Sequence, residues 1–283
     1  MKRESFGSRL GFILVSAGCA IGIGNVWKFP YICGAYGGAA FILIYLCFLV
    51  ILGIPVLVAE FAVGRGSHTS VAKCFDKLAP AGSCWKPLKF IGIIGCYMLM
   101  MFYTTVGGWM IYYCVKSLRG DFVGATPEAV TQSFSDMLGN APTMMLWMVI
   151  ICLIGFAVCF MGLQNGIEKI SKVMMSALLI IMVILAVHSV MMEGAGEGIS
   201  FYLIPDFQKI KEAGVGNVVF AALSQSFFTL SIGIGAMLIF GSYLDKSRSL
   251  TGEAVSITVL DTFVALTAGF IIIPACFSYG IQP

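Results

Sequence analysis

The sequence predicts an all-α polytopic membrane protein, and three observations support this fold class. Of its 283 residues, 59% are hydrophobic and only 11% are charged, and the mean hydropathy is +0.96. A soluble domain carries about 25% charged residues. The apolar residues form continuous stretches of about 20 residues, which is the length of a membrane-spanning helix. They do not alternate over ten-residue segments as membrane-barrel strands do, so the expected surroundings of the chain are a lipid bilayer.

Seven apolar stretches predict seven spans in a single transmembrane domain that covers residues 1–283. The spans are expected at residues 8–36, 39–63, 88–118, 143–162, 168–192, 214–243 and 251–280. The longest connections are 64–87 and 119–142, and 193–213 is expected to be a partly ordered loop.

The basic residues predict how the chain lies in the membrane. If the spans alternate, twelve Lys and Arg residues share a side with the amino terminus and five lie on the other side. Cytoplasmic loops carry an excess of Lys and Arg. We therefore expect a multi-pass protein of the cell (plasma) inner membrane with a cytoplasmic amino terminus. Seven spans then place the carboxyl terminus outside, and the abrupt stop after Pro283 suggests a truncated chain.

Several functional classes are disfavoured by what the sequence lacks. The ten cysteines contain no C-x-x-C pair, and the two histidines stand alone, so neither a disulfide framework nor a Cys/His metal motif is indicated. The net charge of +3 gives no basic stripe for nucleic acid. The sequence shows no nucleophile–base pair of the kind an enzyme would need. It also lacks the rings of polar residues that would line a channel.

Two spans are interrupted by glycine clusters, at residues 18–24 and 225–235. Glycine costs about 1 kcal/mol relative to alanine inside a helix, so each cluster needs a reason. Close helix packing is one, because Gly18 and Gly22 form a G-x-x-x-G pair. A nucleotide loop fits poorly, because Trp27 replaces the third glycine. Two interruptions beside polar residues favour unwound backbone lining a transport site.

Two acidic residues lie within apolar stretches. Asp261 is deep in the seventh stretch, where a carboxylate is costly and by default indicates function, with a cation as its natural partner. Glu60 lies near the end of the second, where it could equally be an interfacial residue. Oxygen ligands suit a hard cation, so Asn25, Thr229 and carbonyls freed by the breaks could hold sodium.

Three quoted motifs carry a family resemblance. The stretches AIGIGNVWKFPYICGAYGGAAFILIYL, GIPVLVAEFAVGR and SQSFFTLSIGIGAMLIFGSYL resemble the neurotransmitter:sodium symporters, most closely the bacterial amino-acid members of the LeuT type. The resemblance implies the LeuT-type inverted-repeat fold with discontinuous helices 1 and 6. It covers only spans 1–7, so the second repeat would be incomplete and the fold truncated after span 7.

The resemblance implies an ion site and a substrate site. Two sodium ions are expected in the complete fold, and Asp261 would supply the negative charge that animal members take from chloride, so chloride would not be required. The implied sodium ligands are Gly18, Ala20, Ile21, Asn25, Thr229 and Asp261. Gly22 stands where monoamine members have an aspartate, which implies an amino acid, and an apolar subsite implies a neutral hydrophobic or aromatic one. The implied substrate residues are Ala20, Gly22, Gly24, Leu99, Tyr103, Phe228, Thr229, Ser231 and Ile234.

The same resemblance implies gates and an overall activity. Lys28 and Gln225 would form the outer gate, and Arg3, Phe6 and Tyr243 the inner gate. Glu60 would support the unwound part of the sixth span. The implied function is sodium-coupled uptake of the amino acid by alternating access. The alternative is a truncated, non-transporting binding or assembly fragment of such a transporter.

Overall fold

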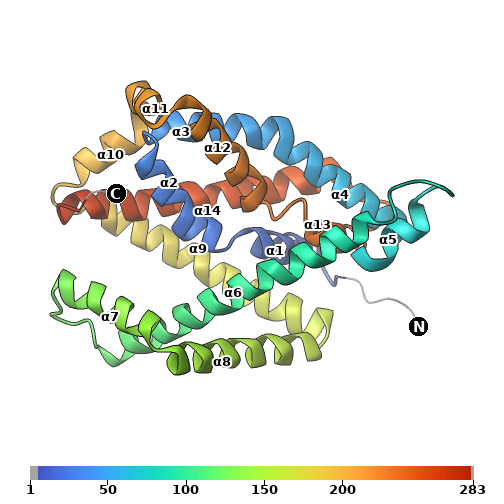
Figure 1. Ribbon diagram of the computed structural model, residues 1–283, viewed down its shortest axis with the longest axis horizontal. Coiled ribbons are helices and arrows are strands. Elements are labelled where there is room, and N and C mark those ends of the chain that lie inside the picture. The colour runs from blue at the N-terminus through green and yellow to red at the C-terminus, as the bar shows by residue number, and fades with distance from the viewer. Residues whose placement is uncertain (1–5, 282–283) are drawn as a thin grey trace.

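The computed structural model describes residues 6–281, which form an all-helical bundle without a strand in that range (Figure 1). The elements are α1 (Arg9–Ala20), η1 (Gly24–Lys28), α2 (Phe29–Ala35), α3 (Ala39–Phe48), η2 (Leu49–Gly53), α4 (Ile54–Ser67), α5 (Val71–Leu78), α6 (Leu88–Arg119), α7 (Pro127–Gly139), α8 (Ala141–Phe160), η3 (Leu163–Glu168), α9 (Lys169–Val190), α10 (Ala195–Leu203), α11 (Phe207–Ala213), α12 (Val215–Thr229), α13 (Ala236–Gly241) and α14 (Leu250–Ser278). The η elements are π-helical turns, each continuous with the helix that follows it.

Within the described residues, five helical segments are long and apolar enough to cross a membrane: Ala39–Ser67, Leu88–Arg119, Ala141–Phe160, Leu163–Val190 and Leu250–Ser278. A sixth span consists of Arg9–Ala20 and Gly24–Ala35, which meet at a bend of 56°. The stretch expected at 214–243 is divided into α12 and α13, and neither half is long enough to qualify alone.

The three long connections between the expected spans contain short helices. Residues 64–87 include α5, residues 119–142 include α7, and residues 193–213 include α10 and α11. Local capping accounts for two of them: the Thr126 side chain accepts from the Ala129 N–H at the start of α7, and the Asp206 carboxylate accepts from two N–H groups at the start of α11. The partly ordered loop expected at 193–213 consists largely of two short helices.

Helix α14 is the centre of the bundle. It contacts α1, α2, α4, α9 and α10 and runs through the middle of the molecule (Figure 1). Helix α13 packs on α4 at Gly64 and Gly241, where an added Cβ would collide with the facing backbone. Helices α6 and α8 pack on each other and leave most of their apolar side chains exposed, as lipid-facing helices do.

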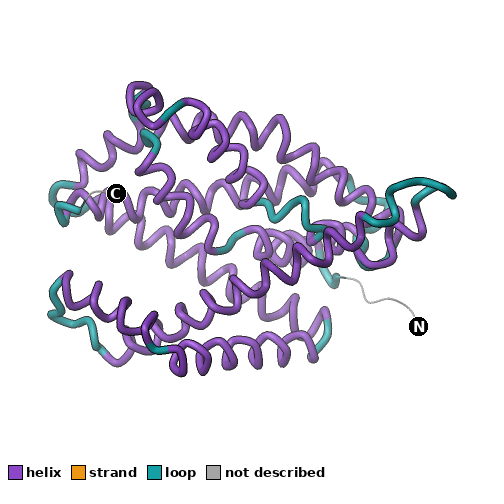
Figure 2. The backbone as a smooth tube through the Cα atoms, in the orientation of Figure 1, coloured by secondary structure: helices purple, strands orange, loops and turns teal. Residues whose placement is uncertain are grey.

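Both predicted interruptions are present, and both lie inside the bundle (Figure 2). The first lies between α1 and η1, where Ile21 adopts an extended conformation. The second lies between Thr229 and Ala236, where Ser231, Gly233 and Gly235 have positive φ angles of 52°, 89° and 79°. The discontinuous first and sixth spans predicted from the sequence are thus confirmed.

Candidate ion and substrate site at the two helix breaks

The two breaks meet α14 at a buried polar cluster. Asn25, Thr229 and Asp261 come from η1, α12 and α14, and all three are fully buried. The Asn25 amide donates to the Asp261 carboxylate at 2.8 Å and to the Thr229 hydroxyl at 3.0 Å. The Thr229 hydroxyl donates to the other Asp261 oxygen at 2.8 Å. Three residues far apart in the sequence therefore form one hydrogen-bonded unit.

The cluster has a carboxylate but no cationic side chain. Both Asp261 oxygens accept from neutral groups, and among the residues that the structure describes none is a Lys, Arg or His paired with it. An unpaired charge is expensive to bury. The neighbouring atoms that could coordinate a cation are oxygens. One of them is the side-chain amide oxygen of Asn25, which accepts from the Gly22 N–H at 3.3 Å. This set of ligands suits a hard monovalent cation such as sodium.

Backbone carbonyls next to the cluster come from the end of α1. A helix leaves its last four carbonyls without helical partners. Two of these in α1 are taken up locally: the Ile21 N–H donates to the Ala17 oxygen at 2.6 Å, and the Ser231 hydroxyl donates to the Cys19 oxygen at 3.0 Å. Gly18 and Ala20 belong to the same terminal turn, and a Cβ on Gly18 would lie 3.2 Å from the Met175 sulfur of α9. Gly18 and Ile21, the residues predicted to bind a second ion through their carbonyls, lie in the last turn and at the C-cap of α1.

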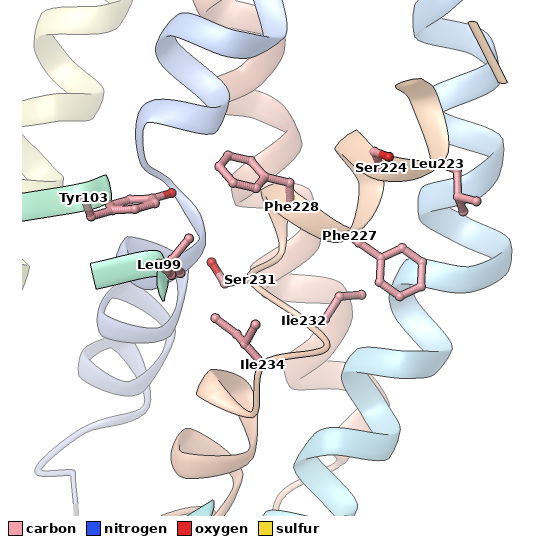
Figure 3. Close-up of a pocket in the computed structure, with 9 residues that line it drawn as sticks. All are labelled: Leu99, Tyr103, Leu223, Ser224, Phe227, Phe228, Ser231, Ile232 and Ile234. Carbon is pink, nitrogen blue, oxygen red and sulfur yellow. The ribbon is translucent and has the colours of Figure 1, made fainter. Parts of the chain in front are cut away.

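A cavity of about 450 Å³ lies beside the breaks (Figure 3). Five of the predicted substrate residues line it, namely Leu99, Tyr103, Phe228, Ser231 and Ile234. Leu223, Ser224, Phe227 and Ile232 also line it, and sequence reasoning missed them. Their spacing carried a signal, because 223/227 and 224/228 are one helical turn apart on α12.

The unwound part of the first span lies against the two aromatic residues of this cavity. A Cβ on Gly22 would lie 3.6 Å from the Tyr103 hydroxyl oxygen, and a Cβ on Gly24 would lie 2.7 Å from two ring carbons of Phe228. Tyr103 and Phe228 point toward each other from α6 and α12 (Figure 3). Gly24 therefore permits an approach that any larger residue would obstruct.

The two residues of the predicted outer gate have different partners. The Lys28 ammonium lies over the Phe228 ring, 4.2 Å from its centroid. The Gln225 amide donates to the Gly24 carbonyl at 3.0 Å, and its own oxygen is buried without a hydrogen bond to any described residue. The structure does not pair Lys28 with Gln225. Lys28 instead contacts Phe228, and Gln225 contacts Gly24.

At the predicted inner gate, Phe6 packs edge-on against Tyr243, with ring centroids 5.8 Å apart. Arg3, the third predicted inner-gate residue, lies outside the described residues. Two ionic contacts nearby were missed from the sequence. Glu168 is 3% exposed and accepts from the Gly7 N–H at 2.8 Å and from Lys172 at 2.6 Å, and Arg9 pairs with Glu253 at 2.9 Å.

Glu60 contacts the second break directly. Its carboxylate accepts from the Gly233 N–H at 2.6 Å and from the Leu238 N–H at 3.2 Å. These N–H groups border the segment where α12 has ended and α13 has just begun, so no regular helix supplies their acceptors. Glu60 is therefore a side-chain acceptor for unwound backbone.

Comparison with known proteins identifies the family in which these features occur. The model of the sodium:neurotransmitter symporter family matches residues 3–133 and 128–279. The chain belongs to this family. YhdH, an uncharacterized sodium-dependent transporter of Bacillus subtilis, is 36% identical over 282 residues, and an uncharacterized sodium-dependent transporter of Haemophilus influenzae is 33% identical over 291. The crystal structure of MhsT in complex with L-phenylalanine is 38% identical and superposes with a TM-score of 0.91.

These comparisons confirm the LeuT-type helical fold and define how much of it the chain represents. All of the chain aligns with YhdH and the Haemophilus protein, and 99% of it aligns with MhsT. It covers 61% of YhdH, 63% of the Haemophilus protein and 63% of MhsT. The chain thus spans about three fifths of these relatives, two of which are described as sodium-dependent transporters.

Proposed function

We propose that this chain contains the binding site of a sodium-coupled symporter for a neutral hydrophobic or aromatic amino acid. The observation that carries the proposal is the buried Asn25–Thr229–Asp261 cluster beside an apolar cavity at two helix breaks. Uptake by alternating access needs no covalent chemistry, and two of the relatives named above are described as sodium-dependent transporters.

We infer the substrate class from the residues that line the first helix break and the cavity beside it. Gly22 has no side chain to bind an amine, and the Tyr103 hydroxyl lies close to it. A substrate carboxylate at this place could accept from Tyr103 and from backbone N–H groups near Gly24. The remaining wall is apolar and aromatic, which suits a hydrophobic side chain, and MhsT was crystallized with L-phenylalanine.

The ion assignments follow from the oxygen ligands. The first sodium would bind the Ala20 carbonyl, Asn25, Thr229 and Asp261, with the substrate carboxylate completing its ligands. The second would use the Gly18 and Ile21 carbonyls together with groups from the part of the fold that this chain does not include. The Asp261 carboxylate makes chloride unnecessary, because it already supplies the negative charge.

The proposed gates and orientation follow the same logic. Phe228 and Tyr103 would cover the substrate from outside with Lys28 and Gln225 above them, while Phe6 and Tyr243, with Arg3, would close the inner end. The amino terminus would be cytoplasmic in a multi-pass protein of the cell inner membrane.

Two assays on the purified chain test the proposal in separate steps. Radiolabelled phenylalanine should bind in sodium but not in choline, whether the anion is chloride or gluconate, and leucine should compete while serotonin should not. In proteoliposomes, an inward sodium gradient should then drive accumulation. Binding that ignores sodium would contradict the proposal. Sodium-dependent binding without accumulation would favour the non-transporting alternative.

A further inference from the structure

A second cavity lies next to the substrate cavity. It has a volume of about 460 Å³ and is lined by residues of α4, α5, α6 and the break between α12 and α13. Ile234 lines both cavities. A volume between about 300 and 1,000 Å³ is typical of small-molecule sites.

The walls of this cavity select an apolar occupant. They consist mainly of aliphatic and aromatic side chains, among them Val56, Val63, Phe75, Leu88 and Ile91. The single carboxylate in the wall belongs to Glu60, and its oxygens already accept from the Gly233 and Leu238 N–H groups. Polar contacts for a hydrophilic ligand are therefore scarce.

The mouth of the cavity has the character of a membrane interface. Trp85 and Ile91 line the cavity and are 63% and 65% exposed. Trp85 is an interfacial residue type, and Lys86 follows it directly. Residues 64–89 contain five Lys or Arg and one acidic residue, Asp76, which is paired with Lys89 at 2.6 Å. Lys86 is exposed and forms no ion pair with a described residue.

We propose that an anionic phospholipid binds here, with one acyl chain in the cavity and its phosphate beside Lys86. The apolar walls match the chain, the exposed mouth provides entry from the bilayer, and the excess of basic residues matches the headgroup. Electrostatic attraction of this kind is expected where basic residues border a membrane surface.

The site would link the lipid to the second helix break. Its wall includes Gly233, Ile234 and Gly235, and a Cβ on Gly235 would lie 2.9 Å from a Val71 methyl group of α5. An acyl chain at this wall would therefore restrict the segment that also lines the substrate cavity. The binding site itself does not depend on the proposed transport activity.

Quenching of Trp85 fluorescence by brominated lipids tests the proposal. The 283-residue chain, with Trp27, Trp109 and Trp147 replaced by Phe, is reconstituted in phosphatidylcholine vesicles that contain increasing brominated phosphatidylglycerol. We expect saturable quenching that is half-maximal at an about fivefold lower mole fraction for phosphatidylglycerol than for brominated phosphatidylcholine, the preference expected from one basic residue.

Matched variants locate the lipid. Ala59 lines the cavity, whereas Ala62 is exposed on the same helix outside it. A59F should abolish the saturable component and A62F should retain it. K86E should remove the preference for phosphatidylglycerol, and K211E on α11 should not. If A59F lowers the helix content of the chain, that variant is misfolded, and the effect of K86E on the lipid preference then tests the proposal. Equal, linear quenching by both lipids, unchanged by K86E, would overturn the proposal.

Discussion

The proposed ion site depends most on Asp261. It is fully buried and receives hydrogen bonds only from Asn25 and Thr229 among the described residues. Neutral donors stabilise a buried negative charge only in part, whereas a bound cation compensates it. Sodium should therefore stabilise the folded chain through this residue.

Asp261→Asn tests that link. The substitution keeps the side-chain shape and removes the charge, so the variant should be at least as stable as the unmodified chain without sodium. At 100 times its dissociation constant, sodium should add about 2.7 kcal/mol to the free energy of unfolding of the unmodified chain, and almost nothing to the variant. Thermal unfolding in sodium and in choline measures both values. The control is Asp245→Asn between α13 and α14, and an equal sodium effect in all three proteins would contradict the assignment.

Gly24→Ala tests the close contact between the first break and Phe228. The added methyl group would lie 2.7 Å from the ring, so the ring must move toward the cavity or the break must shift. We expect phenylalanine affinity to fall about tenfold, a loss of about 1.4 kcal/mol, measured by radioligand binding. Gly216→Ala on α12 is the control, because its Cβ would meet nothing within 4 Å. Unchanged affinity in the Gly24 variant would show that Phe228 does not border the bound substrate.

Site residues that stand out in the sequence could be predicted from it. Contacts between residues far apart in the chain could not. Asn25 and Asp261 were predicted because polar residues stand out in apolar segments. The contact between Glu168 and Gly7 joins positions 161 residues apart, and a glutamate followed by Lys172 reads from sequence as a solvated helix pair. Its burial could be seen only once α1 and α9 were packed together.

Among the elements, the second break depends on groups outside its own helices. Glu60 accepts two N–H groups there, and the Ser231 hydroxyl donates to the Cys19 carbonyl of α1. Ser231 also holds a positive φ of 52°, which is unusual for a residue other than glycine. Tertiary contacts thus maintain an unwound segment that local propensity would not.

Glu60→Gln should weaken this break. A glutamine amide can present one acceptor oxygen, but its NH₂ group faces a second N–H donor, so one hydrogen bond is lost. We expect a decrease of about 1–3 kcal/mol in the free energy of unfolding, the usual cost of an unsatisfied buried group. Thermal unfolding of Glu60→Gln beside Glu193→Gln, an exposed control in the α9–α10 connection, measures the difference. Equal stabilities would mean that the carboxylate is not needed to hold the break.

Long apolar stretches predicted the spanning helices, because a run of about 20 apolar residues has few alternatives in a membrane. The same signal could not reveal α5, α7, α10 and α11, because each is far shorter than a spanning helix. Their caps and packing contacts depend on particular side chains. Leu223, Phe227 and Ile232 were missed for a related reason, because side chains that face a cavity and side chains that face lipid give the same apolar pattern.

Across the whole molecule, Glu168 at the end of η3 and Glu253 of α14 hold the start of α1 in place, through Gly7 and Arg9. Glu168→Gln removes a charged acceptor from the Gly7 N–H and Lys172. Hydrogen bonds to charged groups contribute about 1.5–3 kcal/mol, so amide exchange in Arg9–Ala20 should become roughly tenfold faster or more. Hydrogen-exchange mass spectrometry checks this, with Glu212→Gln on α11 as the control. Unaltered exchange would show that Glu168 does not restrain α1.

The central claim is that one buried cluster couples sodium to amino-acid binding in this chain. The most direct measurement is the affinity for radiolabelled phenylalanine as a function of sodium concentration, for the unmodified chain, Asp261→Asn and Asp245→Asn. We expect the affinity to rise with sodium in the unmodified chain and in Asp245→Asn, and we expect Asp261→Asn to lose this dependence. The same sodium dependence in all three, or in none, would contradict the claim.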